Sequence, residues 1–172
     1  DFLFKPMQGI SGDFYDFYYE GKELKGLSLF DVSGHGIASG LITMIAKSII
    51  FRSFTSEKNM PLPHIIEHAN DRLQDEIGMV DNYISGVLLR LHVNSIEYIN
   101  ASHPDILLKR NNHVQPILKE NNERLSGFFL GIKDMTLPFE NLTININKND
   151  YILLFSDCLI KSKNNYEEYG IE

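Results

Sequence analysis

Three aspartates in this sequence stand where a carboxylate could bind a metal ion. Asp13 follows Gly9-Ile-Ser-Gly12, and Asp31 and Asp157 each end a predicted hydrophobic strand. A carboxylate at the end of such a strand is half-buried and needs a partner. If the three strand ends converge, their oxygens would suit Mg²⁺ or Mn²⁺. The alternative for each aspartate alone is that it starts a turn or caps a helix.

Asp31 also opens the most specific local pattern, Asp31-Val-Ser-Gly-His-Gly36. A glycine-rich turn between a strand and a helix lets the backbone approach a metal or a phosphate. The carbonyl of Val32 would then face the same centre as the Asp31 carboxylate. Asp16 lies three residues from Asp13, and residues three apart on a strand point to opposite faces. We therefore favour Asp13 as the ligand and leave Asp16 as a supporting or structural group.

Four histidines could also carry chemistry. His64 and His68 are four residues apart on a predicted helix and could bind zinc as a pair. No third ligand is evident, so the alternative is a solvated helix face. His35 could act as a general acid, or it could only shape its loop. We expect His103 to be a locally hydrogen-bonded turn residue.

The predicted elements begin with two strands, 13–20 and 24–32, joined by a turn at Gly21-Lys22. The segment after Gly34 is predicted to be an amphipathic helix. Its apolar positions are Ile37, Leu41, Met44, Ile45 and Phe51, widened by Ile49 and Ile50. A second helix is predicted after the prolines at 61 and 63, with Ile66, Ala69, Leu73 and Ile77 on one stripe.

After residue 80 the sequence predicts three hairpins. They pair 83–93 with 96–101, 106–109 with 114–118, and 142–146 with 151–155. Two tandem helices within a series of hairpins exclude a βαβαβ parallel sheet. They favour an α+β architecture of antiparallel sheets with helices packed outside.

Composition limits the class of protein. The 172 residues carry a net charge of −7 and suffice for one domain, 1–172. The absence of a basic cluster argues against a nucleic-acid partner, and no apolar run approaches the roughly 18 residues of a membrane span.

The single cysteine, Cys158, fits a reducing, cytoplasmic compartment. It is not the nucleophile of a Cys-x5-Arg phosphate-binding loop, because position 164 is Asn. Since residue 1 is Asp, we expect a piece of a longer protein, with any sensor domain or membrane anchor outside it.

The chain resembles the SpoIIE/RsbU-type serine phosphatases, a bacterial branch of the metal-dependent type 2C (PPM) protein phosphatases. The motifs Ser11-Gly-Asp-Phe-Tyr-Asp16, Asp31-Val-Ser-Gly-His-Gly-Ile-Ala38 and Ser156-Asp157 occur in the family's order and at roughly its separations. Ala101-Ser-His-Pro104 is similar to the family's Ala-Gly-His-Pro segment, and Leu130-Gly-Ile132 to its Leu-Gly turn. The resemblance extends from residue 9 to the end of the chain.

This resemblance implies an αββα sandwich of two mainly antiparallel sheets flanked by helices, with two Mn²⁺ or Mg²⁺ ions at one edge. Asp31 would bridge both ions, Asp13 and the Val32 carbonyl would hold one, and Asp157 the other. A metal-bound hydroxide would then hydrolyse phosphoserine or phosphothreonine on a protein partner directly. Family substrates are phosphorylated anti-sigma-factor antagonists of the STAS fold, and upstream sensor domains regulate the enzymes. We expect a shift of the helix that begins near Ile37 to switch activity through the Asp31 turn.

The sequence departs from the family pattern near its end. Cys158 replaces the glycine after Asp157, and Lys161 stands where an acid often follows. The chain ends at Glu172, before the final strand and its metal-binding aspartate, so we expect a domain without its C-terminal strand and an incomplete metal site. These departures leave a second hypothesis: a pseudophosphatase that binds a phosphoprotein or a second copy of itself without hydrolysis.

Overall fold

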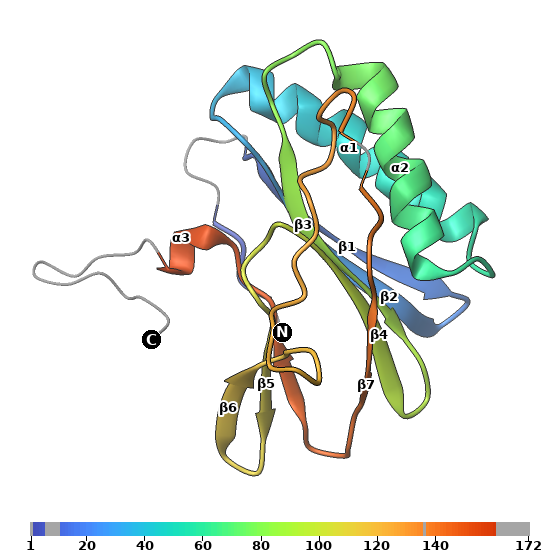
Figure 1. The fold of residues 1–172 in the computed structure, drawn as a ribbon, viewed down its shortest axis with the longest axis vertical. Helices are drawn as coiled ribbons and strands as arrows, with labels where there is room; N and C mark the ends of the chain where they lie inside the picture. The colour runs from blue at the N-terminus through green and yellow to red at the C-terminus, as the bar shows by residue number, and fades with distance from the viewer. Residues whose placement is uncertain (1, 6–10, 136, 161–172) are drawn as a thin grey trace, which may run out of the picture.

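The fold is built on two antiparallel β-sheets, seen in a computed structural model that describes residues 2–5, 11–135 and 137–160 (Figure 1). The larger sheet has the order β1-β2-β3-β4-β7, and the smaller one β6-β5-β8. The strands of the larger sheet are β1 (Asp13–Glu20), β2 (Glu23–Val32), β3 (Ile84–Leu91), β4 (Ser95–Ala101) and β7 (Leu142–Asn145). Those of the smaller sheet are β5 (Leu107–Arg110), β6 (His113–Pro116) and β8 (Tyr151–Leu153).

Two long helices cover one face of the larger sheet (Figure 1). They are α1 (Ile37–Ser56) and α2 (Leu62–Ile77), and a single helical turn, α3 (Asp157–Ile160), follows β8. Because side chains alternate along a strand, Phe30 and Leu88 pack against the helices, whereas Val87 and Leu89 pack with Leu108 of the smaller sheet. The layers are thus helices, sheet and sheet, which confirms the predicted α+β class with two antiparallel sheets.

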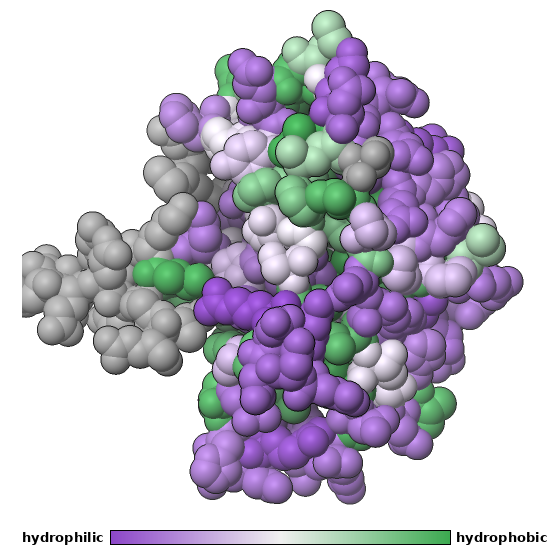
Figure 2. All heavy atoms as spheres, in the orientation of Figure 1, coloured by the Kyte–Doolittle hydropathy of each residue, from purple (hydrophilic) through white to green (hydrophobic). Residues whose placement is uncertain are grey.

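Most local elements follow the sequence pattern. The predicted hairpins of β1 with β2, β3 with β4, and β5 with β6 are all present. Asn111 and Asn112 both have positive φ, 49° and 67°, as a tight turn that twists with its strands requires. The predicted stripe of α2 is buried, and the outer face of α2 is hydrophilic (Figure 2).

The third predicted hairpin is wrong. β7 pairs with β4 in the larger sheet, and β8 pairs with β5 in the smaller one. The intervening turn therefore carries the chain from one sheet to the other. Arg110 holds this turn by donating to the Asp150 carboxylate, with Nη2 to Oδ2 at 2.6 Å, and to the carbonyl of Asn145 at 2.8 Å.

The predicted apolar face of α1 is not its buried face. Ile37, Leu41 and Met44 are exposed, while the buried residues are Ser39, Gly40, Ile42, Ala46, Ile50, Ser53 and Phe54. α1 is apolar around most of its circumference, so periodicity could not select the packing side. By length and composition alone α1 also qualifies as a membrane span, contrary to the expectation that no apolar run approaches that length. This is weak evidence for a span, because the core helices of soluble proteins pass the same test.

A substitution at Gly86 tests the packing of β2 against β3. Gly86 lies opposite Phe30, and a Cβ atom there would stand 1.9 Å from the Phe30 ring. We expect Gly86→Ala to lower the free energy of unfolding by about 1–3 kcal/mol, as overpacking does. Adding Phe30→Leu should relieve the clash, so the double variant should lose less than the sum of the single losses in urea unfolding. Strict additivity would contradict this contact.

Candidate metal centre

Asp13 and Asp31 face each other across the β1–β2 hairpin. They are direct partners in the antiparallel register, which places opposing Cβ atoms about 5 Å apart. Phe14, the neighbour of Asp13, packs against the helices, and Leu29 packs with the smaller sheet. By alternation, both carboxylates therefore lie on the face toward the smaller sheet. The structure brings these two sequence candidates together.

Asp157 approaches the same pair from the start of α3. Its neighbour Ser156 donates a hydrogen bond from Oγ to Asp13 Oδ2 at 3.2 Å. Burial raises the pKa of Asp13, the Ser156 hydrogen bond lowers it, and the negative charge of Asp157 raises it again. Among the described residues, Asp13 Oδ1 is buried without a hydrogen-bond partner. A divalent cation would satisfy this oxygen and offset the repulsion between the carboxylates.

Gly12 lies against two oxygens of the Asp31 segment. The backbone N–H of Val32 donates to the Gly12 carbonyl at 3.2 Å. A Cβ atom at Gly12 would stand 2.5 Å from the Val32 carbonyl oxygen and 3.4 Å from Asp31 Oδ1. The carbonyl and the carboxylate thus border one space. Hard cations take such oxygen ligands, so these donors fit Mg²⁺ or Mn²⁺.

His103, expected only as a locally hydrogen-bonded turn residue, is a neighbour of this centre. Its backbone N–H donates to Asn100 Oδ1 at 2.7 Å, as expected for a locally bonded turn. Its buried ring, however, reaches β3, where Nδ1 is hydrogen bonded to Ser85 Oγ at 3.0 Å. Ser85 is the register partner of Asp31. The His-Pro segment of the family motif was the signal that could have revealed this position.

The pKa of His103 falls to about 4, chiefly because burial disfavours the charged ring, although the Phe155 backbone and the Asp157 charge oppose that fall. The imidazole is therefore neutral at pH 7. The charge of Asp157 raises the pKa of both His103 and Asp13, and its neighbour Ser156 is hydrogen bonded to Asp13.

The structure also places the other residues that the sequence singled out. Asp16 is on the helix side of β1, where its Oδ1 lies 3.1 Å from Lys47 Nζ of α1. It does not join Asp13, in agreement with strand alternation. His35 is exposed in the turn before α1. Cys158 is exposed too, and its Sγ lies 3.0 Å from Ser156 Oγ. Lys161 and the chain end at Glu172 fall outside the described residues.

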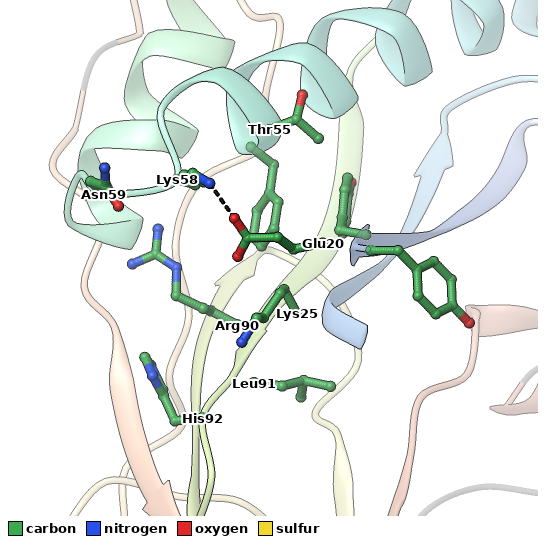
Figure 3. Close-up of a pocket in the computed structure, with 11 residues that line it drawn as sticks. Glu20, Lys25, Thr55, Lys58, Asn59, Arg90, Leu91 and His92 are labelled. Carbon is green, nitrogen blue, oxygen red and sulfur yellow. Dashed lines mark hydrogen bonds and ion pairs between the residues drawn. The ribbon is translucent and has the colours of Figure 1, made fainter. Parts of the chain in front are cut away.

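A pocket of about 410 Å³ lies at the opposite end of the same strands (Figure 3). Its charged lining includes Lys58, which forms an ion pair with Glu20 (Figure 3), and Arg90, which pairs with Glu97 at 3.3 Å. Carboxylates thus balance these cations. β1 runs from Asp13 to Glu20, so the length of that strand separates the pocket from the carboxylates of the candidate metal centre.

Comparisons with known proteins agree with this geometry. Residues 24–172 match the family described as Stage II sporulation protein E (SpoIIE). Phosphoserine phosphatase RsbP of Bacillus subtilis is 24% identical over 161 residues, which cover 91% of this chain and 38% of RsbP. The chain therefore spans well under half the length of that relative.

Two solved structures share the fold. The SiaA-PP2C domain of Pseudomonas aeruginosa superposes with a TM-score of 0.79 at 16% identity, covering 98% of this chain and 65% of that one. The catalytic domain of serine/threonine phosphatase PstP, solved in complex with two manganese ions, gives a TM-score of 0.64 at 15% identity and covers 89% and 74%. From the family match, which covers most of the chain, we conclude that it belongs to the SpoIIE family of PPM-type protein serine/threonine phosphatases.

Proposed function

We propose that this chain hydrolyses phosphoserine or phosphothreonine on a partner protein with the help of two Mn²⁺ or Mg²⁺ ions. Asp13, Asp31, Asp157 and the Val32 carbonyl would hold the ions. The observation that carries the proposal is the register pair of Asp13 and Asp31, with Asp157 beside it and a buried Asp13 oxygen that lacks a hydrogen-bond partner among the described residues. The two manganese ions of the related PstP catalytic domain support the choice of metal.

The bound ions would supply an activated water and neutralise charge on the phosphoryl oxygens. The chain's own residues prepare the site for them. Ser156 orients the Asp13 carboxylate through its hydrogen bond, and Ser85 fixes the ring plane of His103. Gly34 and Gly36, with φ of 92° and 83°, form the sharp turn that follows the Asp31 segment. Because these contacts hold the site in place before the reaction, they lower the free-energy cost of bringing its negatively charged carboxylates together.

The substrate we favour is a phosphorylated anti-sigma-factor antagonist of the STAS fold. The relation to RsbP, which is named a phosphoserine phosphatase, supports a phosphoserine protein as the substrate class. We also propose that this domain is cytoplasmic and that an upstream sensor domain controls it. A membrane anchor could hold the parent protein.

A binding module without catalysis is the second candidate. It is favoured by Cys158, whose side chain stands in place of the family glycine beside Asp157 and lies 3.0 Å from Ser156. Ser156 is also the donor to Asp13, so the thiol contacts the hydroxyl that orients that carboxylate. Such a module would hold a phosphoprotein or a second copy of the chain.

Two Asp→Asn variants distinguish these functions. In a protein that extends beyond residue 172, we expect Mn²⁺-dependent hydrolysis of p-nitrophenyl phosphate and of a phosphoserine protein. Asp31→Asn should lower kcat by at least about 100-fold, because even groups that only support metal ligands are worth about 10–100-fold. Asp16→Asn is the matched control, since Asp16 pairs with Lys47 on the opposite face, and it should keep nearly full activity. Absence of hydrolysis at every Mn²⁺ concentration would favour the binding module.

We further propose that α1 controls the position of Asp13 as well as that of the Asp31 turn. The Thr43 hydroxyl of α1 shares its single proton among three carbonyls: that of Ser39 in its own helix, at 2.9 Å, and those of Gly12 and Ser11, at 3.1 and 3.3 Å. Ser11 Oγ in turn accepts a hydrogen bond from the Asp13 backbone N–H at 3.1 Å. A movement of α1 would therefore be transmitted to the segment that presents the Asp13 carboxylate.

Replacing Thr43 tests this connection. Thr43→Val keeps the shape but removes the hydroxyl, so we expect weaker Mn²⁺ binding and a lower kcat, while stability changes by only about 1 kcal/mol. Thr43→Ser restores the hydroxyl and should recover most of the Mn²⁺ affinity. Equal Mn²⁺ affinity in both variants would show that Thr43 does not position Asp13.

A further inference from the structure

A second cluster of metal-binding side chains lies where α1 ends and α2 begins. Glu57 is the residue after the last turn of α1, and His64 and His68 are one turn apart on α2. His68 Nδ1 lies 2.6 Å from Glu57 Oε1, and His64 Nε2 lies 3.8 Å from Oε2 of the same carboxylate. One ligand atom from each residue lies within 4.8 Å of the other two. Glu57 thus supplies a third side chain of metal-binding type, which the sequence did not reveal.

The donors and their spacing suit zinc. Imidazole nitrogen with carboxylate oxygen is a common zinc ligand set, and two histidines at positions i and i+4 share one helix face. Ligand atoms around a tetrahedral zinc lie about 3.4 Å apart. The separations of 2.6 and 3.8 Å, which run to the two different oxygens of Glu57, fall on either side of that value, so side-chain rotations would bring one oxygen and both imidazoles to coordinating distances. Water would complete the coordination.

A simple ion pair explains only part of this arrangement. The hydrogen bond between His68 and Glu57 accounts for Oε1. It leaves Oε2 buried and without a hydrogen-bond partner among the described residues, while the second imidazole faces that oxygen from beyond hydrogen-bonding distance. The side chains of His64 and His68 are 49% and 44% exposed, so an ion could reach them from solvent.

We propose that Glu57, His64 and His68 form a zinc site separate from the carboxylate centre. α1 spans 20 residues, which corresponds to about 30 Å of helix, and the cluster lies at the end of α1 remote from the Asp31 turn. Bound zinc ties the end of α1 to the first half of α2. Its effect is to fix the corner between the two helices that cover the larger sheet.

Zinc titration of the metal-stripped chain tests the site without any measure of phosphatase activity. The titration is run in saturating Mg²⁺, which occupies oxygen-ligand sites but binds imidazole poorly. We expect one Zn²⁺ per chain by calorimetry, a rise in Tm, and the visible absorption bands of four-coordinate Co²⁺ on substitution. The double variant His64→Gln/His68→Gln should weaken Zn²⁺ binding at least about tenfold and lose the Co²⁺ bands.

Two further variants keep the test decisive. Glu57→Gln preserves the size of the side chain and should also weaken binding at least about tenfold. His113→Gln removes an exposed histidine of β6, outside the cluster, and should bind Zn²⁺ like the unmodified chain. The proposal is overturned if the unmodified chain binds no Zn²⁺ under these conditions, or if Glu57→Gln and the double variant bind it unchanged. Neither result would bear on the carboxylate centre.

Discussion

The candidate metal centre depends on the electrostatic repulsion between the carboxylates of Asp13 and Asp31, which the β1–β2 register places opposite each other. Two carboxylates placed directly opposite each other on a sheet destabilise it, and burial adds to the cost by raising the pKa of Asp13. The charge of Asp157 increases that cost further. Bringing these carboxylates together does not stabilise the folded domain unless a cation binds to them. The surrounding Ser156 hydrogen bond and the close approach of Gly12 to the Val32 carbonyl then become the means by which the ligands are held in place.

The scaffold holds this pair from both faces of the larger sheet. On the helix side, Thr43 links α1 to the segment before Asp13. On the other side, β2 pairs with β3 so that Ser85 stands beside Asp31 and connects it to the His103 ring. Side chains from three distant parts of the sequence thus meet at one end of the sheets. The Glu57 cluster lies at the far end of α1, so the same helix would connect two different metal environments.

Local patterns predicted the parts of the fold that local forces determine. The β1–β2 hairpin and the separation of Asp13 from Asp16 follow from strand alternation, and the buried stripe of α2 follows from helical periodicity. The pairing of β7 with β4 and of β8 with β5 could not be predicted from local sequence patterns, because each strand pairs with a strand that is distant in the sequence. Glu57 was missed as a neighbour of His64 and His68 for the same reason: a turn between helices brings them together. The roles of Asp13, Asp31 and Asp157 came from the family motifs, and no periodicity could supply them.

The most direct test of the central claim is a crystal structure of the chain grown with Mn²⁺, with data collected for the anomalous scattering of manganese. The account predicts anomalous peaks bordered by the carboxylates of Asp13 and Asp31, the Val32 carbonyl and Asp157. Their absence from this position, in crystals that hold manganese elsewhere, would contradict it.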